Sequence, residues 1–180
     1  MAGWSSYNKL DQFIMLPMQS VAMAATTFVS QNVGAKKIRR ADRGTTVSVL
    51  MILAVSAAIA SLLYHFAEPA VRLFSPDQEV ISYGALFIHT NVFFFLVNCL
   101  NHTLAGALRG YGDSKGPMVI LLTGFVAVRQ TYLYVLTHYI SNTPKWVGFG
   151  YPVGWMATGV MIVIYYAVKK RKFNTSGLTL

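Results

Sequence analysis

Long stretches without a charged residue divide the sequence into five apolar windows. The uncharged windows run between Asp11 and Lys36, Arg43 and Glu68, Glu79 and Arg109, Lys115 and Lys145 (interrupted only by Arg129), and Lys145 and Lys169. A helix rises about 1.5 Å per residue, so each window is long enough to cross roughly 30 Å of hydrocarbon. The pattern predicts an all-α, polytopic membrane helix bundle with five transmembrane helices.

Turn-forming residues and charges set the expected bounds of these helices. Gly34 is a natural C-cap, and Pro69 and Pro76 break the chain near its first polar loop. The predicted helices cover residues 6–33, 45–66, 80–108, 118–139 and 147–168. We expect a basic connection at 36–43, one bundle over residues 1–173, and a polar cytoplasmic tail at 174–180.

Composition and charge placement agree with a membrane protein. Hydrophobic residues make up 54% of the chain, and only 12% are charged, about half the average for soluble proteins. The net charge of +9 could indicate nucleic-acid binding, but the cations gather at alternate connections. Five follow the first window, two the third and four the fifth, whereas the other two connections hold only Arg72 and Lys145. This is the positive-inside pattern, so we expect no nucleic-acid partner.

The charge bias also predicts an orientation. The start of the chain should lie outside, and its C-terminus should lie in the cytoplasm. The first eleven residues show no basic region followed by a cleavage site, so no signal peptide is evident. Five crossings with an external start favour a piece of a larger protein; a first helix that inserts with its N-terminus outside is the other interpretation.

Polar residues recur along the third predicted helix. Asn91, Asn98 and His102 follow spacings of seven and four, with Arg109 seven residues further on, so they share a narrow stripe. A polar stripe in a membrane helix must face protein or water. It could line a substrate cavity, or it could form interhelical hydrogen bonds, which amides commonly make in membrane bundles.

The first predicted helix shows a similar face. Asn8, Gln12 and Gln19 share it with Met15, and flexible methionine beside neutral amides suits adaptable binding of apolar ligands. A packed helix seam would show the same residues. Asp11, near the outer end, is the candidate for a coupling-ion site, although an ordinary exposed carboxylate is the alternative.

Arg129 is the most unusual residue in the sequence. It lies midway along the fourth predicted helix, where an arginine costs about 2.5–3.5 kcal/mol on insertion scales. A partner or a wet cavity is therefore expected. The candidate partners are a backbone carbonyl, an amide such as Asn98, or an acid on another chain segment. Arg129 could contribute to the substrate cavity, or it could fix helix packing.

The sequence contains no pattern typical of an enzyme. Cys99 is its sole cysteine, and no arrangement of nucleophile and base, metal ligands or phosphate-binding loop appears. We expect neither catalytic residues nor a metal or organic cofactor. Trp146, Tyr151 and Trp155 lie where an aromatic belt at the membrane interface is expected.

Several motifs, in order and at matching spacing, resemble the multidrug and toxic compound extrusion (MATE) family. They are FVSQNVGA at 28–35 followed by basic residues, YNKLD at 7–11, LFS at 73–75, ALRGYGD at 107–113, and YP at 151–152. Members of this family typically have twelve helices in two lobes around a central cavity. The chain is similar to the C-terminal lobe without its first helix, so the resemblance implies a missing N-terminal lobe in the same chain or a separate one.

The resemblance implies a function that the residues alone do not. Family members export organic cations in exchange for H⁺ or Na⁺ across the bacterial inner membrane, by alternating access. The expected partners are therefore membrane lipid and small, organic, cationic substrates. Two alternatives stay open: a lipid-linked or polysaccharide flippase of the same superfamily, and a truncated membrane protein that does not transport. A flippase cavity should be more cationic than Arg129 alone provides.

Overall fold

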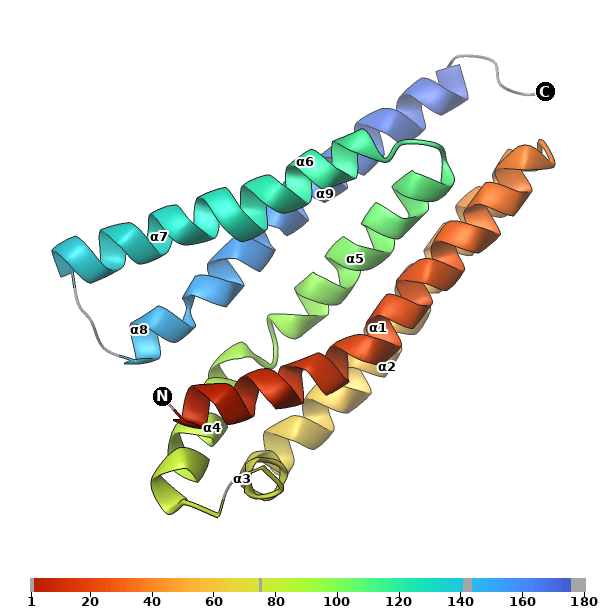
Figure 1. Cartoon of the computed structure of the whole chain (residues 1–180). Coiled ribbons are helices and arrows are strands. Elements are labelled where there is room, and N and C mark those ends of the chain that lie inside the picture. The colour runs from red at the N-terminus through yellow and green to blue at the C-terminus, as the bar shows by residue number, and fades with distance from the viewer. Residues whose placement is uncertain (1, 75, 141–143, 176–180) are drawn as a thin grey trace.

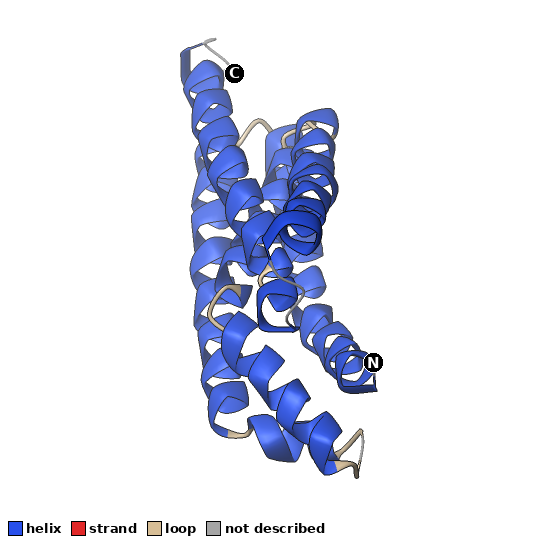
Figure 2. Cartoon of the chain, turned by 90° about the vertical axis from the view of Figure 1, so that its left-hand side faces the viewer, coloured by secondary structure: helices blue, strands red, loops and turns tan. Residues whose placement is uncertain are grey.

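The computed structural model describes residues 2–74, 76–140 and 144–175, and every regular element in these ranges is a helix (Figure 2). The long helices run in similar directions and form an elongated bundle (Figure 1). This is the all-α architecture that the apolar windows predict. The helix bounds differ most from the predicted ones in three places.

The second helix begins earlier than predicted. Helix α1 (Ala2–Gly34) contains Pro17, and α2 (Ile38–His65) follows after a turn in which Lys36 adopts a φ of 60°. The Lys36 and Lys37 amides donate to the carbonyls of Val33 and Asn32, at 2.9 and 2.8 Å. The connection predicted at 36–43 is therefore only a short turn. The basic residues mark the edge of the membrane, but they are good helix formers and do not mark the edge of the helix.

The third predicted helix is broken. The short helix α3 (Ala67–Arg72) leads to α4 (Gln78–Asn91), whose N-cap Asp77 accepts a hydrogen bond from the Glu79 amide at 2.9 Å. Helix α5 (Phe95–Gly110) then departs from α4 by 58°. The prediction of one helix over 80–108 is wrong at this point. Neither proline nor glycine lies in the break at 92–94, so the sequence gives no local signal for it.

The fourth span is one continuous helical rod. It comprises α6 (Lys115–Leu122), the π-helical segment η1 (Thr123–Val128), α7 (Arg129–Val135) and a second π-helical segment, η2 (Leu136–Ile140). The fifth comprises α8 (Pro144–Gly148) and α9 (Gly150–Thr175). Helix α9 extends into the tail predicted at 174–180, and residues 176–180 lie outside the described residues.

Two groups of helices meet along α5 and α9 (Figure 1). Helices α1, α2 and α5 pack together, and α9 lies between α5 and the α6–η2 rod. Glycine allows the closest approach of α1 and α5. A Cβ atom at Gly106 would lie 2.5 Å from the carbonyl oxygen of Ala22. A Cβ atom at Gly110 would lie 2.8 Å from the carbonyl oxygen of Thr26. The Thr26 hydroxyl donates a hydrogen bond to the Gly106 carbonyl, at 2.9 Å. Small residues at such crossings are typical of membrane helix packing.

Three helical stretches are long and apolar enough to cross a bilayer: Ile38–His65, Lys115–Tyr139 and Trp146–Arg171. The bent pair of α4 and α5 is a fourth if it forms one span. In the most apolar windows of the first two, only 17% and 11% of the residues are buried, so broad apolar faces point outward, as lipid contact requires. Helix α1 is not among these stretches, and five crossings remain a prediction.

Candidate substrate-binding site

An aromatic and sulfur-rich cluster fills the junction of α1, α2, α5, η1 and α9. Its buried members, which we call the central cluster, are Met18, Ile52, Phe95, Cys99 and Trp155. Among the half-buried residues packed against them are Met15, Phe94, Phe125 and Tyr151. Trp155 is only 5% exposed and packs its ring against that of Phe95, with centroids 6.5 Å apart. Its predicted place in an aromatic belt is therefore wrong: Trp155 belongs to the interior, whereas Trp146 is 50% exposed.

Two buried amides adjoin the central cluster. Asn98 Nδ2 lies 3.6 Å from the sulfur of Met15 on α1, and Asn101 Nδ2 donates to the Trp155 carbonyl at 2.9 Å. The Oδ1 atoms of both residues are buried and lack a hydrogen-bond partner among the described residues. An unpaired amide oxygen is costly inside an apolar environment. These two oxygens are therefore available to accept hydrogen bonds from a bound molecule or from water.

The break between α4 and α5 divides the predicted polar stripe. Asn91 lies before the break, where its Nδ2 donates to its own helix at the Phe87 carbonyl, 2.9 Å away. Asn98 faces α1. His102 is half-buried, and its ring centroid lies 5.9 Å from that of Phe125 on η1. The four residues therefore do not line one wall.

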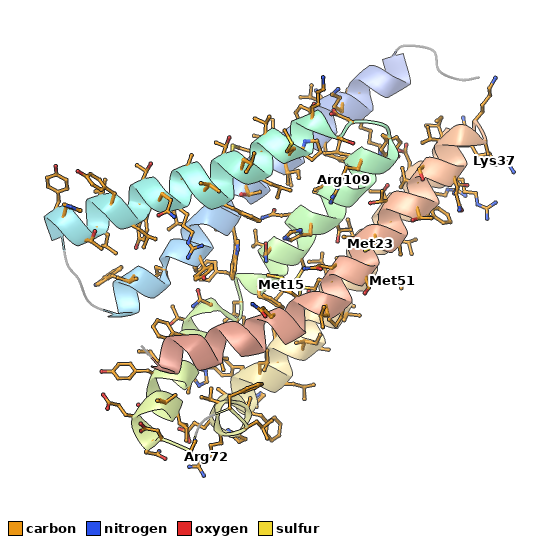
Figure 3. The ribbon with its side chains drawn as sticks, viewed as in Figure 1. Met15, Met23, Lys37, Met51, Arg72 and Arg109 are labelled. Carbon is orange, nitrogen blue, oxygen red and sulfur yellow. The ribbon has the colours of Figure 1, made fainter. Side chains whose placement is uncertain are left out.

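Arg109, at the far end of the stripe, borders a separate groove. It is exposed, and its Nε donates to the Ala105 carbonyl at 3.1 Å (Figure 3). The groove has a volume of about 370 Å³ and lies between the end of α5 and α6–η1. Its lining includes Pro117, Met118, Leu121 and Phe125. The groove shares Phe125 with the edge of the central cluster.

Arg129 stacks on an aromatic ring. Its guanidinium carbon lies 3.8 Å from the centroid of Tyr151 on α9, a cation–π arrangement. Its Nε is buried and has no hydrogen-bond partner among the described residues. Among the described residues, the partner of Arg129 is thus Tyr151 rather than a carbonyl, Asn98 or an acid. Tyr151 packs against the central cluster, so Arg129 adjoins the same cluster as Met15 and Asn98.

The candidate residues of the first predicted helix do not share one environment. Met15 is half-buried against the central cluster, and Figure 3 places it beside the broken end of α5. Gln12 and Gln19 are exposed. The side chains of Asn8 and Asp11 lie outside the described residues, so their predicted roles stay predictions.

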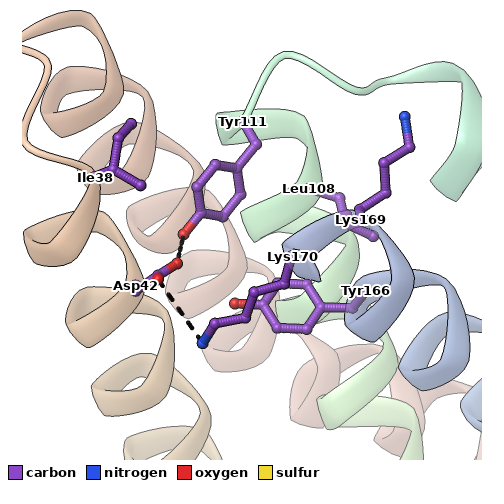
Figure 4. A pocket seen from close by; sticks show the side chains of 7 residues that line it. All are labelled: Ile38, Asp42, Leu108, Tyr111, Tyr166, Lys169 and Lys170. Atoms are coloured by element: carbon purple, nitrogen blue, oxygen red, sulfur yellow. Dashed lines mark hydrogen bonds and ion pairs between the residues drawn. The ribbon is translucent and has the colours of Figure 1, made fainter. Parts of the chain in front are cut away.

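Sequence reasoning missed two acid–tyrosine–lysine groups at the end of the bundle near Lys37. In the first, Asp42 on α2 accepts a short hydrogen bond from the Tyr111 hydroxyl and lies 3.9 Å from Lys170 Nζ on α9 (Figure 4). Burial, followed by the bond to Asp42, raises the pKa of Tyr111. These residues share the lining of a small pocket with Leu108 and Tyr166.

The second group, which we call the Asp113 clasp, comprises Asp113, Tyr165 and Lys169. Asp113 lies in the turn between α5 and α6 and accepts from the Tyr165 hydroxyl at 2.6 Å, while Lys169 Nζ lies 2.9 Å away. The Gly116 amide also donates to Asp113, at 3.0 Å. The Lys169 ammonium and then the Tyr165 hydroxyl hold the pKa of Asp113 at about 2. Both groups fasten the last turns of α9 to neighbouring helices.

Comparison with known proteins decides the family. A family model described as MatE matches residues 1–135 of the 180. The chain belongs to the MATE family. A relative in Oceanobacillus iheyensis, described as a probable multidrug resistance protein NorM, is 33% identical over 150 residues, which cover 83% of this chain and 32% of the relative. The MATE chain therefore spans about a third of the length of that relative. This chain is a multi-pass membrane protein.

Solved structures share the fold of this MATE chain. It matches the inward-facing conformation of a multidrug resistance MATE family transporter with a TM-score of 0.84 at 13% identity, covering 96% of this chain and 39% of that one. It also matches the outward-facing conformation of a multidrug resistance MATE family transporter, with a TM-score of 0.85 at 14% identity. That match covers 94% of this chain and 37% of the other. At these identities the likeness concerns the fold alone.

Proposed function

We propose that this chain works within a multidrug efflux transporter that exports small organic cations across the bacterial inner membrane by alternating access. The observation that carries the proposal is the convergence of Met15, Asn98 and Trp155 at the central cluster. These residues come from three different helices that are far apart in sequence. Substrate sites of secondary transporters lie near the middle of the membrane, where helices are broken, and α5 begins at such a break.

The chemistry of the central cluster suits varied aromatic substrates. Methionine is flexible and polarisable, and aromatic rings attract cations and stack with flat molecules. The unpaired Oδ1 atoms of Asn98 and Asn101 provide neutral acceptors for the N–H groups of a substrate. A surface that can repack, with few fixed charges, favours breadth of binding over strict selectivity.

The fold comparisons support a particular form of alternating access. The chain matches inward-facing and outward-facing structures about equally well, with TM-scores of 0.84 and 0.85. This portion would therefore move largely as one body, and access would change where it meets another part of the transporter. A coupling ion acts in such a cycle by binding the two conformations with different affinities.

We propose H⁺ or Na⁺ as the coupling ion, with Asp11 as its candidate site. The proposed orientation places the Lys37 turn, the α5–α6 turn and the end of α9 in the cytoplasm. Asp42 and Asp113 join these three segments at one end of the bundle, opposite the end that holds Arg72 (Figure 3). The cations of alternate connections thus gather on one side, in support of this orientation.

An efflux assay tests the proposal. The protein is expressed from its whole gene in a bacterial host that lacks its own multidrug pumps, and the cellular accumulation of ethidium is followed by fluorescence. We expect lower accumulation than with empty vector, and recovery when the ion gradients are collapsed. Equal accumulation with confirmed membrane expression would contradict drug efflux. Lipid-linked sugar accumulating on the outer face instead would favour the flippase alternative.

A further inference from the structure

The positive charge of Arg129 does not help the central cluster to bind cations. A guanidinium beside the cluster repels a cationic substrate, yet it occupies the middle third of the Lys115–Tyr139 span. We propose, on the basis of the proposed transport function, that Arg129 selects aromatic substrates that also carry a carboxylate. The preferred substrates would then be zwitterions, with the aromatic rings and neutral amides receiving the rest of the molecule.

The geometry leaves Arg129 a donor for such a group. One face of the guanidinium is occupied by Tyr151, at 3.8 Å from its ring centroid. Nε is buried without a hydrogen-bond partner among the described residues, so its N–H group is available to an acceptor. An arginine fixed by stacking is prepared for a carboxylate, because less side-chain freedom is lost on binding.

Five of the six carboxylates of this chain lie at the two ends of the bundle, and the side chain of the sixth, Asp11, lies outside the described residues. Asp42 and Asp113 are at the cytoplasmic end, where they pair with Lys170 and Lys169. Glu68, Asp77 and Glu79 lie in α3 and at the start of α4, at the other end of the bundle. A substrate carboxylate would therefore meet Arg129 without competition from these five acids. Because charge-assisted hydrogen bonds strengthen in a dry environment, this contact would contribute strongly to selectivity.

Two dyes that differ by one ester separate this role from a structural one. Rhodamine B carries a free carboxylate on a cationic ring system, and its methyl ester carries the same ring system without the negative charge. Efflux of both is measured in cells that express the whole gene, as wild type and as Arg129→Gln. We expect the substitution to reduce rhodamine B efflux about tenfold and efflux of the ester less than twofold. Arg129→Lys should fall between, because it keeps the charge but loses the planar fork.

Arg72→Gln is the matched control, since Arg72 is an exposed cation on α3 at the far end of the bundle (Figure 3). It should transport both dyes as the wild type does. An equal loss of both dyes in Arg129→Gln, or no loss of either, would overturn the assignment while leaving drug efflux intact. If wild type exports neither dye nor ethidium, the proposed transport function fails first. Should Arg129→Gln not reach the membrane, binding of both dyes to the purified wild type and Arg129→Lys decides: a preference for rhodamine B over its ester that is weaker in Arg129→Lys than in the wild type supports the assignment, and equal affinity of the wild type for the two dyes contradicts it.

Discussion

Gly124 of η1 faces Thr158 of α9 so closely that any side chain at position 124 would overlap the threonine hydroxyl. A Cβ there would also lie 3.1 Å from the Thr158 backbone at Cα. The hydroxyl itself is fixed, because it donates to the Gly154 carbonyl at 2.8 Å. The α6–η2 rod and α9 are thus joined at a contact that only glycine permits, five residues before Arg129 on one helix and seven residues after Tyr151 on the other.

Gly124→Ala should destabilise the protein by about 1–3 kcal/mol, the usual cost of overpacking a tight contact. The added methyl group must push η1 away from α9. Thermal unfolding of the purified protein in detergent measures the loss. Thr158→Ala removes the nearest atom, so the double variant should recover part of the stability that Gly124→Ala loses.

Gly34→Ala is the matched control for this pair, because a Cβ at Gly34 meets no atom within 4 Å. It should unfold at nearly the wild-type temperature. If Gly34→Ala and Gly124→Ala lower that temperature equally, the loss does not arise from contact with α9.

The Asp113 clasp predicts a dependence of stability on pH. The pKa of Asp113 is about 2 in the folded protein against an ordinary value of 3.8, so its carboxylate stabilises the fold fully above the ordinary value. That contribution should disappear as the pH falls from about 4 towards 2. Asp113→Asn should lower the unfolding temperature at neutral pH and narrow the difference from wild type below pH 4. Glu68→Gln, at the opposite end, should leave the wild-type profile unchanged.

The sequence predicted the helices better than their bends. Uncharged windows locate the helices because an unpaired backbone is intolerable in hydrocarbon. The early start of α2 escaped prediction because charges such as Arg39 and Arg40 report where water begins, and a helix can continue into water. The break before Phe95 escaped because neither proline nor glycine marks it. It depends on packing between residues that are distant in sequence.

The candidate site was predictable only in part. Asn98 and Arg129 stand out because polar residues in an apolar window need a reason to be there. Tyr151 did not stand out, because an aromatic residue near a helix end also suits the membrane interface. The Asp113 clasp was missed because its members are brought together by the fold from positions 52 residues apart.

The membrane orientation can be tested by cysteine labelling in intact cells. The native Cys99 is buried, so an impermeant thiol reagent should not reach it. Cysteine at Lys37 should resist the reagent until the membrane is opened, because the positive-inside bias places this turn in the cytoplasm. Gln78→Cys, at the start of α4, should react in intact cells and serves as the control. Labelling at position 37 before the membrane is opened would show the orientation to be wrong.

Asn98→Leu tests whether the amide belongs to the substrate path or only to helix packing. The substitution keeps a similar volume, removes an unpaired buried oxygen, and loses the contact of Nδ2 with the Met15 sulfur. If the oxygen receives a substrate N–H group, loss of one hydrogen bond should weaken ethidium resistance about fivefold while membrane abundance is unchanged. Asn91→Leu is the matched control, since Asn91 lies before the break and bonds within its own helix. Equal loss of resistance in the two variants, or a fall in abundance that parallels resistance in Asn98→Leu, would assign Asn98 to packing. Resistance lost only in Asn98→Leu, at normal abundance, would place the central cluster on the route of the drug.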